Sequence, residues 1–139
     1  MVFCDISGFT ALSERLAKKG RVGSEEVAAA LTKVFSEMLD IAIGRGGDLL
    51  KFGGDALLLL FTGPGHCARA AASAFEMQQR LKVVGRIETG SGRVVLDMTV
   101  GVNTGRFDLF VVGDRHGELV VAGADASGTV RAEESSDKG

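Results

Sequence analysis

The chain has 139 residues, its 16 Lys and Arg against 18 Asp and Glu give a net charge of −2, and 45% of its residues are hydrophobic. This length and composition suit one folded domain that spans residues 1–139. The balanced charge argues against nucleic acid and against contact with a membrane surface, because both select basic patches. There is no signal peptide and no apolar run of membrane-spanning length, so we expect a cytoplasmic protein. Met1 stands almost inside the first strand, so we also expect a domain trimmed from a longer chain.

Hydrophobic patterns alternate between strand and helix periodicity along the chain. Strands are predicted over residues 1–5, 48–52, 56–61, 94–102, 107–112 and 118–122. Helices are predicted over about 9–19, from a cap at Ser24 to about 43, and over about 66–83 and 125–134, with a polar loop over 85–92. The order β-α-β-β-α-β, then two strands and a helix, predicts an α/β (α+β) fold with a ferredoxin-like core, an appended β-hairpin and a C-terminal helix.

Two aspartates stand at predicted strand ends. Asp5 ends the first strand, and Asp55 follows the tight turn Gly53-Gly54 before the third strand. Each alone is most simply a turn-capping residue. In a ferredoxin-like sheet the first and third strands are antiparallel neighbours, so the two acids are expected to meet. Mg²⁺ favours few carboxylates combined with substrate phosphates, and the pair therefore predicts a metal-nucleotide site.

The segment that follows Asp5 predicts a phosphate site. Gly8, Phe9 and Thr10 open the first helix, where backbone N–H groups are free and the helix dipole favours anions. A plain helix start is the simpler interpretation of these residues taken alone. Their place directly after Asp5 favours phosphate binding.

Two basic residues complete the candidate set. Lys51 precedes the Gly-Gly turn and is either an exposed strand lysine or a donor to an acceptor such as adenine N1. Arg131, on the last predicted helix, is either solvated or paired with a glutamate, or it is a clamp on charge that develops at phosphorus.

These motifs resemble the catalytic domain of the class III nucleotidyl cyclases, the adenylyl and guanylyl cyclase family. Phe3 to Thr10 is similar to the first metal motif of the family, and Lys51 to Asp55 to its substrate-lysine and second-metal motif. Gly101 to Gly105 is similar to a strand-end motif, and Gly113-Asp114 and Gly123 to Glu133 to the dimerisation arm and final helix. The resemblance covers nearly the whole chain, in a divergent branch that resembles the soluble, bicarbonate-responsive adenylyl cyclases.

The resemblance implies a catalytic activity, its metal ligands and substrate-binding residues, and a dimeric partner. Asp5, Asp55 and the carbonyl of Ile6 would hold two Mg²⁺ or Mn²⁺ ions, and Lys51 would bind adenine. The ribose 3′-hydroxyl would attack the α-phosphate, which converts ATP to cyclic AMP and pyrophosphate. Sites of this family lie at a head-to-tail dimer interface, so the expected partner is a second copy or another cyclase domain in a pseudo-heterodimer.

Three residues in the last third of the chain stand at positions where the family has functional residues. Arg131 stands where the family has its transition-state arginine. Val120 stands at the second base-reading position, where it can make no side-chain hydrogen bond, and Ser127 replaces the asparagine that orients the ribose. These departures favour an alternative, a catalytically degenerate cyclase-homology domain that binds nucleotide and regulates a partner.

Two further families are weaker matches. A diguanylate cyclase or polymerase palm shares the core and the acids, but its second hairpin acid is absent after Asp55, where Ala56 stands. A phosphoacceptor receiver expects a parallel sheet and paired acids after the first strand, against which the Gly-Gly hairpin and the single Asp5 argue.

Overall fold

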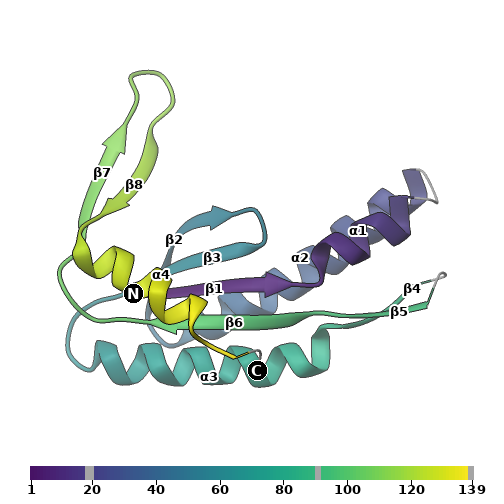
Figure 1. Cartoon of the computed structure of the whole chain (residues 1–139), viewed down its shortest axis with the longest axis horizontal. Coiled ribbons are helices and arrows are strands. Elements are labelled where there is room, and N and C mark those ends of the chain that lie inside the picture. The colour runs from purple at the N-terminus through teal and green to yellow at the C-terminus, as the bar shows by residue number, and fades with distance from the viewer. Residues whose placement is uncertain (18–20, 90–91, 138–139) are drawn as a thin grey trace.

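The computed structural model describes residues 1–17, 21–89 and 92–137. Twelve elements follow in chain order (Figure 1): β1 Val2–Ser7, α1 Phe9–Ala17, α2 Arg21–Gly44, β2 Gly47–Gly53, β3 Ala56–Phe61, α3 His66–Val84, β4 Arg86–Thr89, β5 Gly92–Val95, β6 Asp97–Val102, β7 Asp108–Val112, β8 Glu118–Ala122 and α4 Ala124–Glu134. Within the described residues, no helix is long and apolar enough to cross a membrane.

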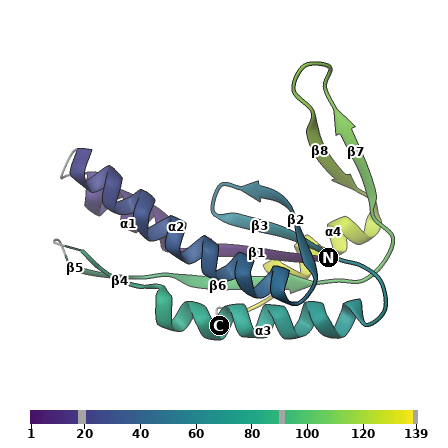
Figure 2. The same ribbon diagram turned by 180° about the vertical axis from the view of Figure 1, so that it is seen from behind.

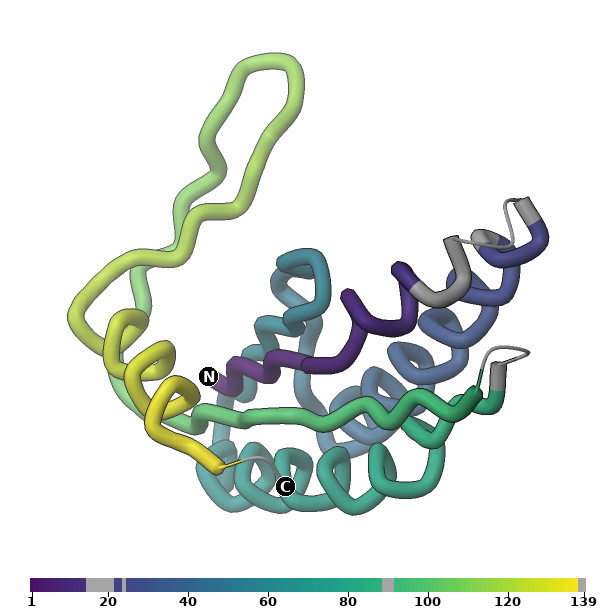
Figure 3. Tube along the Cα trace, turned by 45° about the vertical axis from the view of Figure 1, so that its right-hand side comes forward, coloured from purple at the N-terminus to yellow at the C-terminus, as the bar shows by residue number. Residues whose placement is uncertain are grey.

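The central sheet has the order β2-β3-β1-β6, and every neighbouring pair is antiparallel. β1 therefore lies beside β3, and the predicted ferredoxin-like α/β architecture is confirmed. The long helices α2 and α3 pack together on the core side, whereas α4 packs on β6 and β1 (Figures 1 and 2). Strands β7 and β8 form a separate hairpin, called the arm below, which rises from the end of the sheet where β6 ends (Figure 3).

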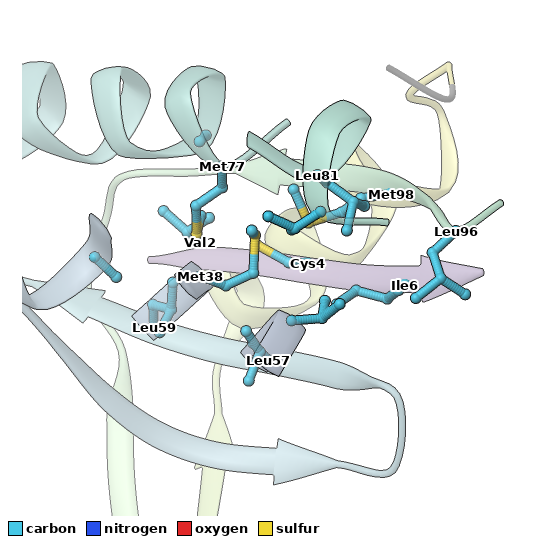
Figure 4. Close-up of a cluster of buried hydrophobic side chains, with 14 of the residues drawn as sticks. Val2, Cys4, Ile6, Met38, Leu57, Leu59, Met77, Leu81, Leu96 and Met98 are labelled. Atoms are coloured by element: carbon cyan, nitrogen blue, oxygen red, sulfur yellow. The ribbon is translucent and has the colours of Figure 1, made fainter. Parts of the chain in front are cut away.

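The core forms on one face of β1 because its side chains alternate. Val2, Cys4 and Ile6 are buried and point into a cluster with residues of α2, α3, β3 and β6 (Figure 4). Burial raises the pKa of the Cys4 thiol to about 12, helped by the charge of Glu133, so Cys4 is an inert core residue. The opposite face of β1, which carries Phe3 and Asp5, is left for the site.

The predicted start of the second helix is wrong. Helix α2 begins at Arg21 rather than after Ser24, because its first turn packs beside α1, with Gly23 buried, and this contact outweighs the capping signal. The predicted closing residues of the first helix, 18–20, lie outside the described residues.

The predicted loop over 85–92 is also corrected. Its described part contains β4 and the start of β5, which pair as a hairpin in which Ile87 faces Val94. The predicted long strand over 94–102 is accordingly two strands, β5 and β6, joined at the buried Leu96, whose N–H donates to the carbonyl of Gly85 at 2.9 Å. Ile87 is the only apolar residue of β4, too weak a signal for a strand.

The lack of a side chain at Gly101 allows α4 to pack closely against the sheet. A Cβ at this position would lie 2.4 Å from both the Glu133 nitrogen and the Thr129 carbonyl oxygen. We expect Gly101→Ala to lower the free energy of unfolding by about 1–3 kcal/mol, measured by urea denaturation, because α4 must move away. Gly44→Ala is the matched control, since no atom lies within 4 Å of its added Cβ. Equal stability of the two variants would contradict this packing of α4.

Candidate active site

Asp5 and Asp55 lie next to each other at one end of the β1–β3 pair. Asp5 is opposite Ala56 in the strand register, and the Ile6 N–H donates to the Asp55 carbonyl oxygen at 3.1 Å. Both aspartates are half-buried. The fold thus brings together two acids that are fifty positions apart in the sequence.

The oxygen donors at this point suit a hard divalent cation. Two carboxylates and the nearby backbone carbonyl of Ile6 are the ligand types that Mg²⁺ and Mn²⁺ take. In the described part of the chain, no three His, Cys, Asp or Glu side chains gather at one place. Two carboxylates leave coordination positions for phosphate oxygens, so the residues fit a cation that is shared with a nucleotide.

A sharp turn sets the start of α1 directly behind these acids. Gly8 has φ +94°, and a Cβ there would lie 2.7 Å from the Val95 carbonyl oxygen, so only glycine fits. Its carbonyl accepts the first helical hydrogen bond from the Leu12 N–H at 3.1 Å. The amides of Phe9 and Thr10 belong to the first turn, where N–H groups have no partner within the helix. This helix end can bind a phosphate.

Lys51 forms an ion pair with Glu118, the first residue of β8. The lysine lies in a row across the sheet, opposite Leu58, which is in turn opposite Phe3. Both side chains remain accessible, with 41% of Lys51 and 68% of Glu118 exposed. The hydrogen bond and charge of Lys51 lower the pKa of the Glu118 carboxyl. The Glu118 carboxyl is therefore ionised at neutral pH.

A cavity of 420 Å³ lies between the open face of the sheet and α4. Phe3 and Leu58 form its floor, and Ser127 lies in its wall. Its size is that of a small-molecule site. Leu58, the cross-strand neighbour of Lys51, is thus part of the cavity floor.

The remaining predicted residues are spread over β8 and α4. Val120 is 41% exposed and pairs with Phe110 in the arm. Arg131 is exposed, and its guanidinium makes no hydrogen bond or ion pair with any described residue. The structure thus brings together Asp5 with Asp55, and it places Lys51 opposite Leu58, which lines the same cavity as Ser127. Among the described residues that line this cavity, neither Lys51 nor Arg131 is present.

Glu118, the partner of Lys51, is a residue to which the sequence patterns assign no role in the site. The sequence predicts only that Glu118 begins a strand, because its partner Lys51 is 67 positions away. A signal was nevertheless present, because Glu118 lies two residues before Val120 and so on the same face of β8.

Comparison with known proteins identifies the family. The model of the "Adenylate and Guanylate cyclase catalytic domain" matches residues 1–139. Human adenylate cyclase type 10 is 31% identical over 128 residues, which cover 88% of this chain and 8% of that protein. Its rabbit counterpart is 31% identical over 118 residues, which cover 82% of this chain and 7% of that protein. The chain therefore spans less than a tenth of these relatives.

Solved structures agree over almost the whole chain. The guanylate cyclase domain of RhGC from Catenaria anguillulae, in complex with GTP, superposes with a TM-score of 0.80 at 26% identity, over 99% of this chain and 72% of that one. The adenylyl cyclase CyaB from P. aeruginosa superposes with a TM-score of 0.79 at 25% identity, over 99% of this chain and 71% of that one. A dimeric guanylyl cyclase domain from Blastocladiella emersonii superposes with a TM-score of 0.77 at 25% identity, over 99% of this chain and 73% of that one. The matched fold and the full-length family match show that the chain belongs to the adenylate and guanylate cyclase catalytic domain family.

Proposed function

We propose that the chain is an adenylate cyclase-type domain that converts ATP to 3′,5′-cyclic AMP and pyrophosphate. The observation that carries this proposal is the 3.1 Å hydrogen bond from the Ile6 N–H to the Asp55 carbonyl, which holds Asp5 and Asp55 at one strand end. Two acids beside a helix N-terminus suit a nucleotide that carries metal ions on its phosphates.

Each residue of the proposed site has a separate task. Asp5, Asp55 and the Ile6 carbonyl would hold two Mg²⁺ or Mn²⁺ ions, which when bound favour ionisation of the ribose hydroxyl and neutralise the phosphates. The amides of Gly8, Phe9 and Thr10 donate to phosphate oxygens. Lys51 donates to the base, and Val120 can add only apolar contact. Ser127 bonds the ribose through its hydroxyl, and Arg131 donates to the α-phosphate as its charge develops.

The proposed active form is a dimer, either of two copies or with another cyclase domain. Arg131 is exposed, so its guanidinium is accessible to a nucleotide held by the acids of a partner. The arm exposes Leu109, Phe110, Val111 and Val112, and a two-stranded hairpin of this kind is marginally stable alone. Contact with a partner would bury these side chains.

The test is cyclic AMP formation by the purified chain with ATP and Mn²⁺ over a wide range of protein concentration. A catalytic dimer predicts that activity rises more than proportionally with concentration, until the dimer is saturated. Absence of product at every concentration, with ATP bound normally, would contradict the catalytic proposal.

A degenerate, nucleotide-binding domain is the second candidate. It is favoured by Val120 and Ser127, which lack the side chains expected at the base- and ribose-binding positions. This candidate predicts metal-dependent ATP binding without turnover, and restoring the asparagine with Ser127→Asn separates the two, because only an intact catalytic site gains rate from it.

Lys51→Glu is expected to weaken ATP binding relative to GTP by about tenfold, equivalent to about 1.4 kcal/mol. The substitution removes the donor to adenine N1 and introduces an acceptor in its place. Competition of ATP and GTP for the chain in Mn²⁺ measures the ratio directly. An unchanged ratio would show that Lys51 does not contact the base.

A further inference from the structure

We propose that Glu118 is a specificity-determining residue that reads the adenine base together with Lys51, and so supplies the acceptor that Val120 lacks. The inference rests on the proposed function, and it goes further by assigning the base subsite to a pair of side chains. The contact that carries it is the hydrogen-bonded ion pair of Lys51 and Glu118, formed within one chain between β2 and the arm.

The positions of Lys51 and Glu118 support this assignment. Lys51 lies in the cross-sheet row with Leu58 and Phe3, both of which line the 420 Å³ cavity. Glu118 and Val120 alternate with Leu119 and therefore share one face of β8. The carboxylate of Glu118 is thus available on the face of β8 where Val120 can offer no hydrogen bond.

Charge is the second argument. A lone ammonium group selects an anion, whereas a nucleobase is neutral and presents donors and acceptors side by side. The ammonium of Lys51 has three donors, of which Glu118 takes one, and the carboxylate keeps acceptor capacity after that bond. The pair has no net charge and offers one donor and one acceptor, which suits a neutral base edge better than Lys51 alone would.

The order of the two groups discriminates between the bases. With Lys51 at N1 of adenine, Glu118 accepts from the exocyclic N6 amino group. Guanine in the same orientation would present its N1–H donor to the ammonium and its O6 acceptor to the carboxylate, so both contacts would become repulsive. The pair in this order therefore favours ATP over GTP.

The experiment measures binding of ATP and GTP to the full chain in Mn²⁺, by competition against a fluorescent nucleotide, for wild type, Glu118→Ala and Glu118→Gln. We expect Glu118→Ala to reduce the ATP-to-GTP affinity ratio by five- to twentyfold, and Glu118→Gln, which keeps an acceptor oxygen, to reduce it less. Glu88→Ala is the matched control, because the Glu88 side chain is 65% exposed, close to the 68% of Glu118, and it also forms an ion pair, with Arg93 in the β4–β5 hairpin. That variant should leave the ratio unchanged.

A charge exchange makes the test sharper. The double variant Lys51→Glu with Glu118→Lys keeps the ion pair but reverses the order of donor and acceptor, so we expect it to favour GTP. An ATP-to-GTP ratio at the wild-type value in both Glu118→Ala and the double variant would overturn the proposal. Tighter ATP binding by Glu118→Ala would also overturn it, since Glu118 would then block the base subsite rather than read the base.

The same measurements separate this inference from the proposed function. If Asp55→Ala weakens binding of both nucleotides while the Glu118 variants leave the ratio unchanged, the base assignment fails and the metal-nucleotide site stands. If the ratio responds as expected but no cyclic AMP forms, the base assignment stands and the catalytic proposal fails. If wild type binds neither nucleotide, both fail.

Discussion

Replacing Asp5 or Asp55 with alanine is expected to abolish Mn²⁺-dependent nucleotide binding and to lower cyclic AMP formation by roughly 1,000-fold. Metal ions contribute several kcal/mol of transition-state stabilisation, and about 1.4 kcal/mol corresponds to a factor of ten in rate. Either substitution leaves a single carboxylate at the site. The fold should be kept, because the Ile6–Asp55 hydrogen bond joins backbone atoms and holds the strands in register in both variants. The expected loss therefore comes from the metal ligands and not from the fold.

Stability measurements separate these two causes. Asp5 and Asp55 are only half-buried, so the free energy of unfolding in urea should change by no more than about 1 kcal/mol. Asp48→Ala is the matched control, since Asp48 is exposed on β2 opposite Leu60, and it should bind nucleotide as wild type does. Affinity for Mn²⁺-ATP like that of wild type in both Asp5→Ala and Asp55→Ala would refute the site.

The β1–β3 half of the site was predictable because its signals are local. The alternation of Val2, Cys4 and Ile6, and the Gly53-Gly54 turn before an apolar strand, each specify an element, and ferredoxin-like topology then places β1 beside β3. The meeting of Asp5 and Asp55 follows from that adjacency. The same motifs carry the resemblance to the cyclase family, which the family match over residues 1–139 confirms.

The parts that depend on long-range contacts were not predictable in this way. The pairing of Lys51 with Glu118 depends on where the arm stands relative to β2, and no periodicity encodes that position. The start of α2 at Arg21 is a similar case, because packing against α1 extends the helix by a turn that its own residues do not signal. Sequence patterns specify which faces are apolar, whereas these features depend on what covers those faces.

Arg131→Ala is expected to lower the rate of cyclic AMP formation by about 100- to 1,000-fold, with ATP affinity changed by less than about threefold. A donor aimed at charge that appears only in the transition state contributes to rate and little to binding. The guanidinium makes no hydrogen bond or ion pair with any described residue, so its loss should affect stability little. Arg86→Ala, at an exposed arginine of β4, is the control and should retain full activity.

Mixing two inactive variants tests whether Arg131 acts across a dimer interface. In an equal mixture of Asp55→Ala and Arg131→Ala chains, half of the dimers are mixed. If each site takes its aspartates from one chain and its arginine from the other, each mixed dimer has one intact site, and about a quarter of wild-type activity should return. If both residues serve a site within one chain, every site in the mixture is defective and no activity returns. Recovery would therefore place Arg131 in the partner's site, and its absence would assign Arg131 to the site of its own chain.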